Sequence, residues 1–290
     1  MRLTRSEKIW KSWIYIAMIT VAIVTVLPVW HVLMQSISRP TAQSGGLYLF
    51  PRGFSLAAYK MVIKDPLILS GFKVTIIVTV CGTAINLVIS FLGAYPLTRK
   101  DLVGRTVIQY LIFFTMLFGG GLIPTYIIVS KLKMVNTYWA LIIPGALSPY
   151  QMFVLRNFIQ NLPESLQESA RIDGASEMRV LVRIIIPLSV PVIAVLGLMF
   201  GVGHWNSWFS SVIYTTKPSM LSLQAVMRQI LMVDTTSQYF ANVTEMYEEA
   251  AMPKSLQMAI VSVATLPILC VYPFLQKYFV KGIMLGAVKG

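Results

Sequence analysis

Residue types that most often carry enzyme chemistry are scarce in this 290-residue sequence. His31 and His204 are its two histidines, and each stands alone in an apolar stretch, where a single histidine is more often structural than catalytic. The two cysteines, Cys81 and Cys270, are far apart and lack the spacing of a metal site. The phosphate-binding motif G-x-x-x-x-G-K-[ST], the zinc motif H-E-x-x-H and the nucleophile motif G-x-S-x-G are absent. The sequence therefore predicts a chain that is not an enzyme, without catalytic residues, a metal site or a cofactor of its own.

Charged side chains are concentrated and balanced in one segment, residues 156–183. A helix lying on anionic lipid is usually biased towards positive charge, whereas a balanced, patterned surface suits docking to a protein partner. The balanced charge of this segment favours a protein partner. Binding to the lipid surface remains the alternative interpretation. The charged residues are Arg156, Arg171, Arg179 and Arg183, together with Glu164, Glu168, Asp173 and Glu177.

The same segment is predicted to form two short helices joined at a glycine. Asn161 is the expected N-cap of the first helix, with Glu164 at capping-box spacing and Pro163 in the first turn. Gly174 is expected to end that helix, because glycine readily adopts the left-handed conformation of a C-terminal cap. The second helix would lead directly into an apolar stretch.

Apolar stretches dominate the rest of the chain and predict an integral membrane protein. Hydrophobic residues make up 56% of the sequence, charged residues 12%, and the mean hydropathy is +0.71. Soluble domains contain about 25% charged residues, and disordered chains are poor in apolar residues. The net charge of +13 is then interpreted as basic residues near the ends of membrane spans, and nucleic acid is not an expected partner.

Six stretches are long enough for a helix to cross a bilayer, which takes about 20 apolar residues. The first is expected to be an uncleaved span, because its apolar run is longer than the core of a signal peptide. More than half of the 24 Lys and Arg residues fall on one side if both termini are cytoplasmic, which predicts that orientation. The predicted spans are Ile14–Ser36, Val74–Leu97, Val107–Ser130, Tyr138–Leu155, Ile184–Phe209 and Leu256–Gln276.

The central parts of these spans contain no Asp, Glu, Lys or Arg. Proton-coupled carriers normally need carboxylates or histidines within the membrane as relays, so proton coupling is disfavoured. A sodium-coupled secondary carrier that uses backbone carbonyl groups is not excluded. A membrane enzyme or scaffold is a third alternative. If energy is supplied from ATP, the absence of a phosphate-binding motif places the ATPase on another subunit.

One motif in the charged segment identifies a family resemblance. Glu168-Ser-Ala-Arg-Ile-Asp-Gly174 is followed, after nine residues, by Ile184-Ile-Ile-Pro187. This run resembles the EAA motif of ABC importer permeases, E-A-A, three residues, G, nine residues, I-x-L-P. Ser169 and Ile186 depart from the usual residues, but the spacing is kept.

Further stretches resemble carbohydrate-importer permeases, and the resemblance covers essentially the whole chain. It is closest to the maltose-type second permease and to the group that serves larger oligosaccharides, including alginate and pectin fragments. The stretches are Asn86, Ala94-Tyr-Pro-Leu-Thr-Arg99, Phe118-Gly-Gly-Gly-Leu-Ile-Pro124-Thr-Tyr126, His204-Trp-Asn-Ser-Trp-Phe209, Tyr272-Pro-Phe-Leu-Gln-Lys277 and Lys281-Gly-Ile-Met-Leu-Gly-Ala-Val-Lys-Gly290.

The resemblance implies a type I ABC importer permease fold in the bacterial cytoplasmic (inner) membrane. Residues 1–290 would form a single transmembrane domain, with a core permease region at 74–276 and a cytoplasmic coupling loop at 156–183. The implied partners are a second permease subunit, two ATPase subunits that carry ATP and Mg²⁺, and an extracytoplasmic solute-binding protein. The chain would form half of a translocation pathway for oligosaccharides.

The resemblance also implies roles for individual residues. The coupling loop would seat on an ATPase, with a carboxylate from Glu168, close packing at the small residues and a bend at Gly174. The implied coupling residues are Glu168, Ser169, Ala170, Asp173, Gly174 and Ala175. The C-terminal tail would reach the ATPases through Lys281, Gly282, Lys289 and Gly290.

Substrate contacts are expected where aromatic and hydrogen-bonding side chains occur together, because sugars stack on rings and bond to a few polar groups. The alternative is an interfacial aromatic belt with hydrogen bonds between helices, and this interpretation is the stronger one from the residues alone. The candidate substrate-path residues are His204, Trp205, Asn206, Trp208, Tyr150 and Gln151.

Overall fold

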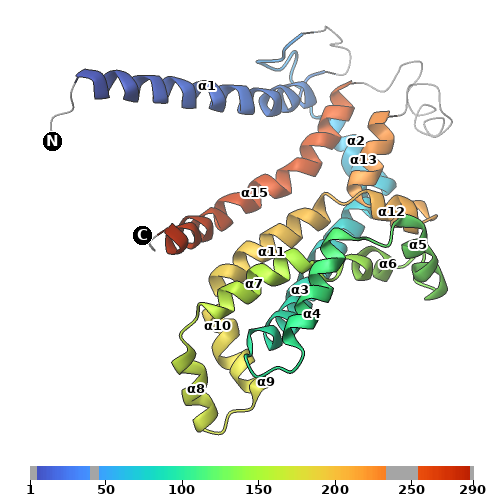
Figure 1. The fold of residues 1–290 in the computed structure, drawn as a ribbon. Coiled ribbons are helices and arrows are strands. Elements are labelled where there is room, and N and C mark those ends of the chain that lie inside the picture. The colour runs from blue at the N-terminus through green and yellow to red at the C-terminus, as the bar shows by residue number, and fades with distance from the viewer. Residues whose placement is uncertain (1–4, 40–45, 233–253, 288–290) are drawn as a thin grey trace. The chain divides into compact units, whose positions relative to one another are not determined.

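The computed structural model describes residues 5–39, 46–232 and 254–287 of the chain. Within these residues the protein is helical, and the single β-type contact is an isolated antiparallel bridge between Ser38 and Phe54. The all-helical prediction is therefore confirmed. Figure 1 shows these helices as a ribbon coloured by residue number. The chain divides into two compact units, Met1–Ile68 with Met227–Leu266, and Leu69–Val226 with Pro267–Gly290.

The first unit contains a long N-terminal helix, α1 (Arg5–Ser36). Large apolar side chains of α1 are exposed from Trp10 to Val26, as expected for a helix whose environment is lipid. The hydroxyl groups of Thr20 and Thr25 donate to carbonyl oxygens one turn earlier, at 2.9 Å, so these polar groups are satisfied within the helix.

Asp65 separates α2 (Ala57–Lys64) from α3 (Pro66–Ala94). Its carboxylate oxygen Oδ1 accepts hydrogen bonds from the backbone N–H groups of Leu67, at 2.7 Å, and Ile68, at 3.2 Å. Proline follows at the first helical position, where its missing N–H and fixed φ suit a helix start. This N-cap defines the beginning of a 29-residue apolar helix.

The second unit is built from most of α3 and from a series of shorter helices. A 3₁₀ turn follows α3, and a short π-helix, η3, connects α9 to α10. The elements are η1 (Pro96–Thr98), α4 (Arg105–Leu117), α5 (Leu122–Lys131), α6 (Tyr138–Ile142), η2 (Ile143–Gly145), α7 (Pro149–Gln160), α8 (Glu164–Ile172), α9 (Glu177–Val180), η3 (Leu181–Ile185), α10 (Ile186–Leu188), α11 (Val190–Trp205), α12 (Phe209–Tyr214) and η4 (Pro218–Met220).

Two further helices complete the described chain. They are α13 (Leu223–Met232) and α15 (Lys254–Ala287). Each of them continues from one compact unit into the other.

Three of the predicted spans are not continuous helices. The helix pair α4 and α5 is bent by 112° at Phe118–Gly121, where Gly121 has φ +84°. The segment from α9 to α10 meets α11 at 81°, with Ser189 between two prolines. Pro191 cannot donate a backbone hydrogen bond, and its ring clashes with the carbonyl group one turn earlier in a straight helix. The continuous helix expected at Ile184–Phe209 is therefore wrong.

The predicted span Tyr138–Leu155 is also divided, into α6, η2 and α7. Pro144 lies within η2, and Pro149 begins α7. In the described residues, three helices are long and apolar enough to cross a membrane, or up to five if each bent pair counts as one span. Six spans are therefore not confirmed by helix length and composition.

The core of the second unit is formed where α3, α7, α9 with η3, and α11 pack together. Leu155, Val180 and Leu196 are completely buried there. A Cβ atom at Gly93 on α3 would lie 2.9 Å from the sulfur atom of Met152 on α7, so the missing side chain permits close approach of these helices. This core supports the segment between α7 and α11, which contains the predicted coupling loop.

Candidate functional site

The first helix of the predicted coupling loop, α8, begins one residue after Pro163. Asn161 does not cap it. Asn161 is instead the C-cap residue of α7, and its side-chain amide donates to the carbonyl oxygen of Asn157 at 2.8 Å. The predicted N-cap was wrong because the fixed φ of Pro163 turns the chain after α7 has ended, which leaves Asn161 on the earlier helix.

The bend at Gly174 is confirmed. Gly174 follows the C-cap of α8 and has φ +78°, and the next N–H, of Ala175, donates to the carbonyl oxygen of Ala170 at 2.9 Å. Apart from its two neighbours in sequence, no heavy atom of the described residues lies within 4 Å of a Cβ built at this glycine. Glycine is therefore favoured here by backbone conformation and not by a lack of space.

The predicted coupling residues divide between two faces of the loop. Ala170 and Ala175 pack against the core of the second unit. Glu168, Ser169, Asp173 and Gly174 are exposed. Within the described residues, Glu168 and Asp173 make no ion pair and no side-chain hydrogen bond. Ile172 on the same short helix is 86% exposed, so the loop exposes an apolar side chain as well as two carboxylates.

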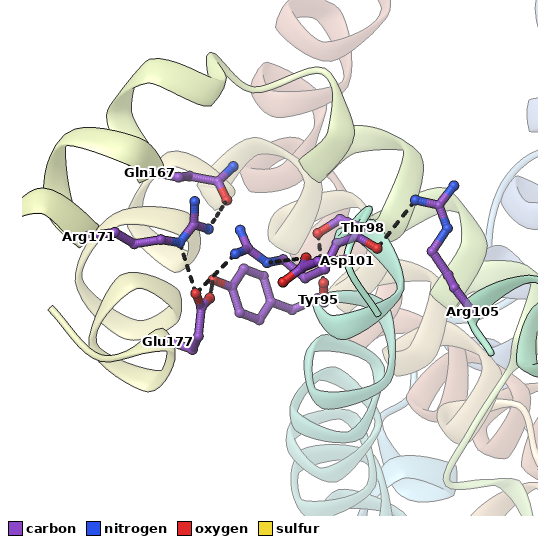
Figure 2. Close-up of polar contacts among 8 residues, drawn as sticks. Tyr95, Thr98, Asp101, Arg105, Gln167, Arg171 and Glu177 are labelled. Atoms are coloured by element: carbon purple, nitrogen blue, oxygen red, sulfur yellow. Dashed lines mark hydrogen bonds and ion pairs between the residues drawn. The ribbon is translucent and has the colours of Figure 1, made fainter. Parts of the chain in front are cut away.

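Glu177, the first residue of α9, is the centre of a polar network on the inner side of the loop (Figure 2). Its oxygen Oε1 lies 2.8 Å from Nε of Arg171 on α8 and 3.1 Å from Nη2 of Arg99. The hydroxyl group of Tyr95 donates to the other oxygen, Oε2, at 2.5 Å. One carboxylate therefore joins α8 and α9 to the segment that follows α3.

The three partners of Glu177 are sheltered or held by further contacts. Tyr95 directly follows α3 and is buried, with its ring in the same core. Arg99 follows η1, and its side chain is 23% exposed. Arg171 is also anchored within its helix, because its Nη2 group donates to the side-chain oxygen of Gln167 at 3.3 Å.

Sequence reasoning did not select Glu177, Tyr95 or Arg99 as site residues. Arg171 and Glu177 appeared only as part of a balanced charge pattern, while Tyr95 and Arg99 lie in a stretch noted for its family resemblance. Arg99 and Glu177 are 78 residues apart, so local spacing carries no signal for their contact.

A second ion pair connects the same two segments at the surface. Nζ of Lys100 lies 3.4 Å from Oε2 of Glu164 at the start of α8, and both side chains are mostly exposed. Arg156 on α7 adds a further link, because its Nε donates to the carbonyl oxygen of Leu97 at 3.1 Å. The loop after α3 is thus tied to both ends of the α7–α8 connection.

His204 takes part in a hydrogen-bonded brace between helices. Its Nε2 atom lies 2.7 Å from Oδ1 of Asn86 on α3, and Nδ2 of Asn86 donates to the carbonyl oxygens of Gly145, at 2.8 Å, and Ala146, at 3.0 Å. Asn86 is 1% exposed. Gly82 makes room for the ring, since a Cβ there would lie 2.6 Å from Nε2. The geometry supports the interhelical interpretation of His204.

The other candidate substrate-path residues lie in different settings. Trp205 is buried, with its ring edge-on to Phe72 at 6.4 Å. Trp208 packs edge-on against Phe209. The exposed Asn206 donates to the carbonyl oxygen of Val202 in its own helix, at 3.0 Å.

Tyr150 and Gln151 lie in the first turn of α7, where Tyr150 is 57% exposed. No hydrogen bond or ring contact joins His204 to either of them, and all three belong to the described part of the chain. A shared substrate path for the six candidates therefore stays a prediction.

The predicted C-terminal contact residues are only partly described. The backbone of Lys281 and Gly282 belongs to α15. Lys289 and Gly290 lie outside the described residues.

Comparison with known proteins shows that this chain is similar to members of a transport family. Residues 8–285 match the family model described as "Binding-protein-dependent transport system inner membrane component". The polygalacturonan/rhamnogalacturonan transport system permease protein YtcP of Bacillus subtilis is 40% identical, over 96% of this chain and 97% of its own length. Protein LplC of the same organism is 42% identical, over 93% and 91%.

More distant matches agree with these. The trehalose/maltose transport system permease protein MalG of Thermococcus litoralis is 27% identical, with 99% of each chain covered. A chain in the crystal structure of a bacterial ABC transporter involved in the import of the acidic polysaccharide alginate matches with a TM-score of 0.88 and 26% identity, over 96% of this chain and 99% of that chain. The protein described here belongs to the family of inner membrane components of binding-protein-dependent transport systems, the membrane-spanning permeases of ABC importers.

Proposed function

We propose that this chain forms half of the translocation pathway of an ATP-driven importer for oligosaccharides. Its partners would be a second permease subunit, two ATPase subunits that bind ATP and Mg²⁺, and an extracytoplasmic solute-binding protein. Family membership supports this assembly, because the family description itself refers to binding-protein-dependent transport. The proposed location is the bacterial cytoplasmic membrane.

The observation that carries the proposal is the two-faced structure of the loop between α7 and α11. Its inner face is packed and hydrogen-bonded, whereas Glu168, Asp173 and Ile172 face outward with no partner among the described residues. Unpaired carboxylates beside an exposed apolar side chain suit a protein interface with basic groups. We therefore assign this outer face as the ATPase-docking surface, with Glu168 as its principal charge.

The proposed mechanism is alternating access. ATP closes the ATPase dimer, the docked loops approach one another, and the spans reopen towards the binding protein. ATP can drive this change only if it binds more tightly to one conformation of the complex than to the other, because a ligand shifts an equilibrium by its differential affinity. Residues of this chain hold the loop in place for that step.

The proposed topology has six spans with both termini in the cytoplasm, in one transmembrane domain over residues 1–290 with a core permease region at 74–276. The bent pairs α4–α5 and α10–α11 would each complete one crossing. Labelling of single cysteines, introduced after Cys81 and Cys270 are replaced by serine, tests this topology. A cysteine at Ser169 should react only from the cytoplasmic side, and one at Thr216 only from the opposite side.

The proposed substrates are oligosaccharides. Relatives named for transport of polygalacturonan and rhamnogalacturonan, and a structural neighbour named for import of alginate, make fragments of these polymers the first candidates. A binding screen of the cognate solute-binding protein against neutral and acidic oligosaccharides identifies the preferred class. Binding of small non-carbohydrate solutes alone would contradict this assignment.

Uptake by the complete complex in proteoliposomes tests the proposed function. Import should require ATP inside the vesicles and should stop with vanadate. Glu168→Lys should reduce import and weaken ATPase binding while the complex remains inserted, because it reverses the charge of the docking surface. Uptake driven by an ion gradient through the isolated chain would contradict the proposal and support a secondary carrier.

A further inference from the structure

The carboxylate of Glu177 has two kinds of partner that differ in what they connect. Arg171 lies six residues away on α8, so its ion pair with Glu177 closes across the bend at Gly174. Tyr95 and Arg99 lie 82 and 78 residues away, at the end of α3 and just after η1. The first contact is internal to the coupling loop, and the second joins the loop to a membrane-spanning helix.

Between α9 with η3 and the end of α3, the contacts of Glu177 with Tyr95 and Arg99 add direction to packing that is otherwise apolar. Val180 and Leu181 of the loop belong to the same buried cluster as Ala94 and Leu97 at the end of α3. Apolar burial is not directional, so by itself it favours contact without a preferred bond angle. A charge-assisted hydrogen bond has a preferred length and angle. The carboxylate of Glu177 therefore holds α9 and the end of α3 in one register.

The exposed ion pair nearby does not provide the same restraint. Lys100 and Glu164 connect the same loop to the start of α8, but their side chains are 81% and 65% exposed. Arg99 and Arg171 are only 23% and 25% exposed. Solvent and salt weaken exposed pairs more than sheltered ones. The Glu177 side chain is 51% exposed, but its two arginine partners are sheltered. The Glu177 network is thus a stronger candidate for transmitting force than the Lys100–Glu164 pair.

We propose that the contacts of Glu177 with Tyr95 and Arg99 form a joint that passes movement of the coupling loop to α3, while the Arg171–Glu177 pair shapes the surface that docks on the ATPase. This inference rests on the proposed function. It assigns positioning roles to Tyr95, Arg99, Arg171 and Glu177. It also predicts that affinity for the ATPase and coupling of ATP hydrolysis to transport depend on different contacts of the same loop.

The test compares variants of the complete complex in proteoliposomes with the loaded binding protein. The double variant Y95F/R99M removes the joint, and R171M removes the internal pair. Measured quantities are the dissociation constant for the ATPase subunit, the rate of ATP hydrolysis and the sugar imported per ATP. K100Q serves as a matched control, because it removes the exposed pair between the same segments.

For Y95F/R99M, we expect sugar imported per ATP to fall about tenfold, with the ATPase dissociation constant within about twofold of wild type. For R171M, we expect the dissociation constant to rise about tenfold. K100Q should match wild type in all three quantities. Y95F alone removes one hydroxyl group from a retained ring, and it should lower the import ratio in the same direction as the double variant.

A charge-inverted variant provides a rescue. R99E/R171E/E177R reverses the charges of Glu177 and its two arginine partners and leaves Asp101, which lies 3.7 Å from Arg99 and is 79% exposed, unchanged. It should recover part of the import ratio that E177R alone loses. If Y95F/R99M imports as much sugar per ATP as wild type, the proposed joint is refuted. The proposal is also refuted if Y95F/R99M and R171M lose ATPase affinity equally. A wild-type complex without ATP-dependent uptake would instead refute the proposed function itself, and the joint with it.

Discussion

At the residue scale, Glu177 combines contacts that sequence neighbours cannot supply. Its two oxygen atoms accept from two arginines and a tyrosine, which come from α8 and from the segment after α3. Removal of this carboxylate would leave Arg99 and Arg171 close together, mostly sheltered from water and without their common counter-charge. Two guanidinium groups in that position repel each other.

Replacement of Glu177 by Gln should therefore loosen α8 and α9. We expect a local loss of about 1–2 kcal/mol, because a hydrogen bond to a charged group is worth about 1.5–3 kcal/mol and Glu177 is half exposed. Hydrogen exchange of the amides in both helices measures this change. Glu164→Gln is the control, and faster exchange in that variant to the same extent would show that the position of the charge does not matter.

The brace at His204 gives a second prediction for a single residue. His204→Ala leaves Oδ1 of the buried Asn86 without its partner, which should destabilise the protein by about 1–3 kcal/mol. Asn206→Ala removes only an exposed hydrogen bond within one helix and should be nearly neutral.

Thermal unfolding in detergent and the KM for sugar uptake distinguish the two interpretations of His204. A lower unfolding temperature with unchanged KM agrees with a brace. A raised KM with unchanged stability would show that His204 contacts the sugar.

At the element scale, the coupling loop depends on the bend at Gly174. The positive φ of this residue requires a backbone conformation that a β-branched side chain strongly disfavours. The surrounding space is open, so side-chain volume alone is not an obstacle. Conformation and size can therefore be tested separately at this position.

Gly174→Val should reduce transport severely, whereas Gly174→Asn should retain most of it, because asparagine enters the left-handed region at low cost. The difference corresponds to about 1–2 kcal/mol of backbone strain. Import per ATP and the content of assembled complex are the quantities to measure. Equal transport by the two variants would mean that the bend does not depend on the left-handed conformation.

At the scale of the whole molecule, many apolar side chains are exposed, both on continuous helices and beside breaks in helices. The helix α1 is continuous from Arg5 to Ser36, with Pro28 inside it. A continuous helix satisfies nearly all of its own backbone groups, so lipid can surround it. The pair α4 and α5 is broken at Phe118–Gly121. Within the described part of the chain, a Cβ at Gly119 or Gly120 would meet no heavy atom within 4 Å other than those of its sequence neighbours. Irregular backbone at membrane depth is tolerated where protein or water covers it, and not against lipid.

A photo-crosslinking residue at Gly120 should therefore attach to the second permease subunit in the assembled complex. The same residue at Val21 on α1 should label lipid instead. Mass spectrometry of the crosslinked products measures the outcome. Lipid labelling alone at both positions would contradict the expectation that protein covers the break.

Much of this architecture was predictable because the signals are local. Apolar composition indicated a helical membrane protein, the spacing of Glu168, Gly174 and Pro187 indicated the family, and the chemistry of glycine indicated the bend. Span continuity was predicted less well. Hydropathy is averaged over a window of residues and is insensitive to a break at a single proline or glycine. The spans predicted at Tyr138–Leu155 and Ile184–Phe209 are therefore divided in the structure.

The sequence by itself determined the helical class, the membrane environment and the family, because composition, motif spacing and glycine conformation are properties of neighbouring residues. Only the tertiary structure decided which charges meet. It showed that Glu177 is shared by Arg171, Arg99 and Tyr95, and that His204 is bonded to Asn86. Such contacts join residues that are up to 118 positions apart, and packing of helices alone brings them within hydrogen-bonding distance.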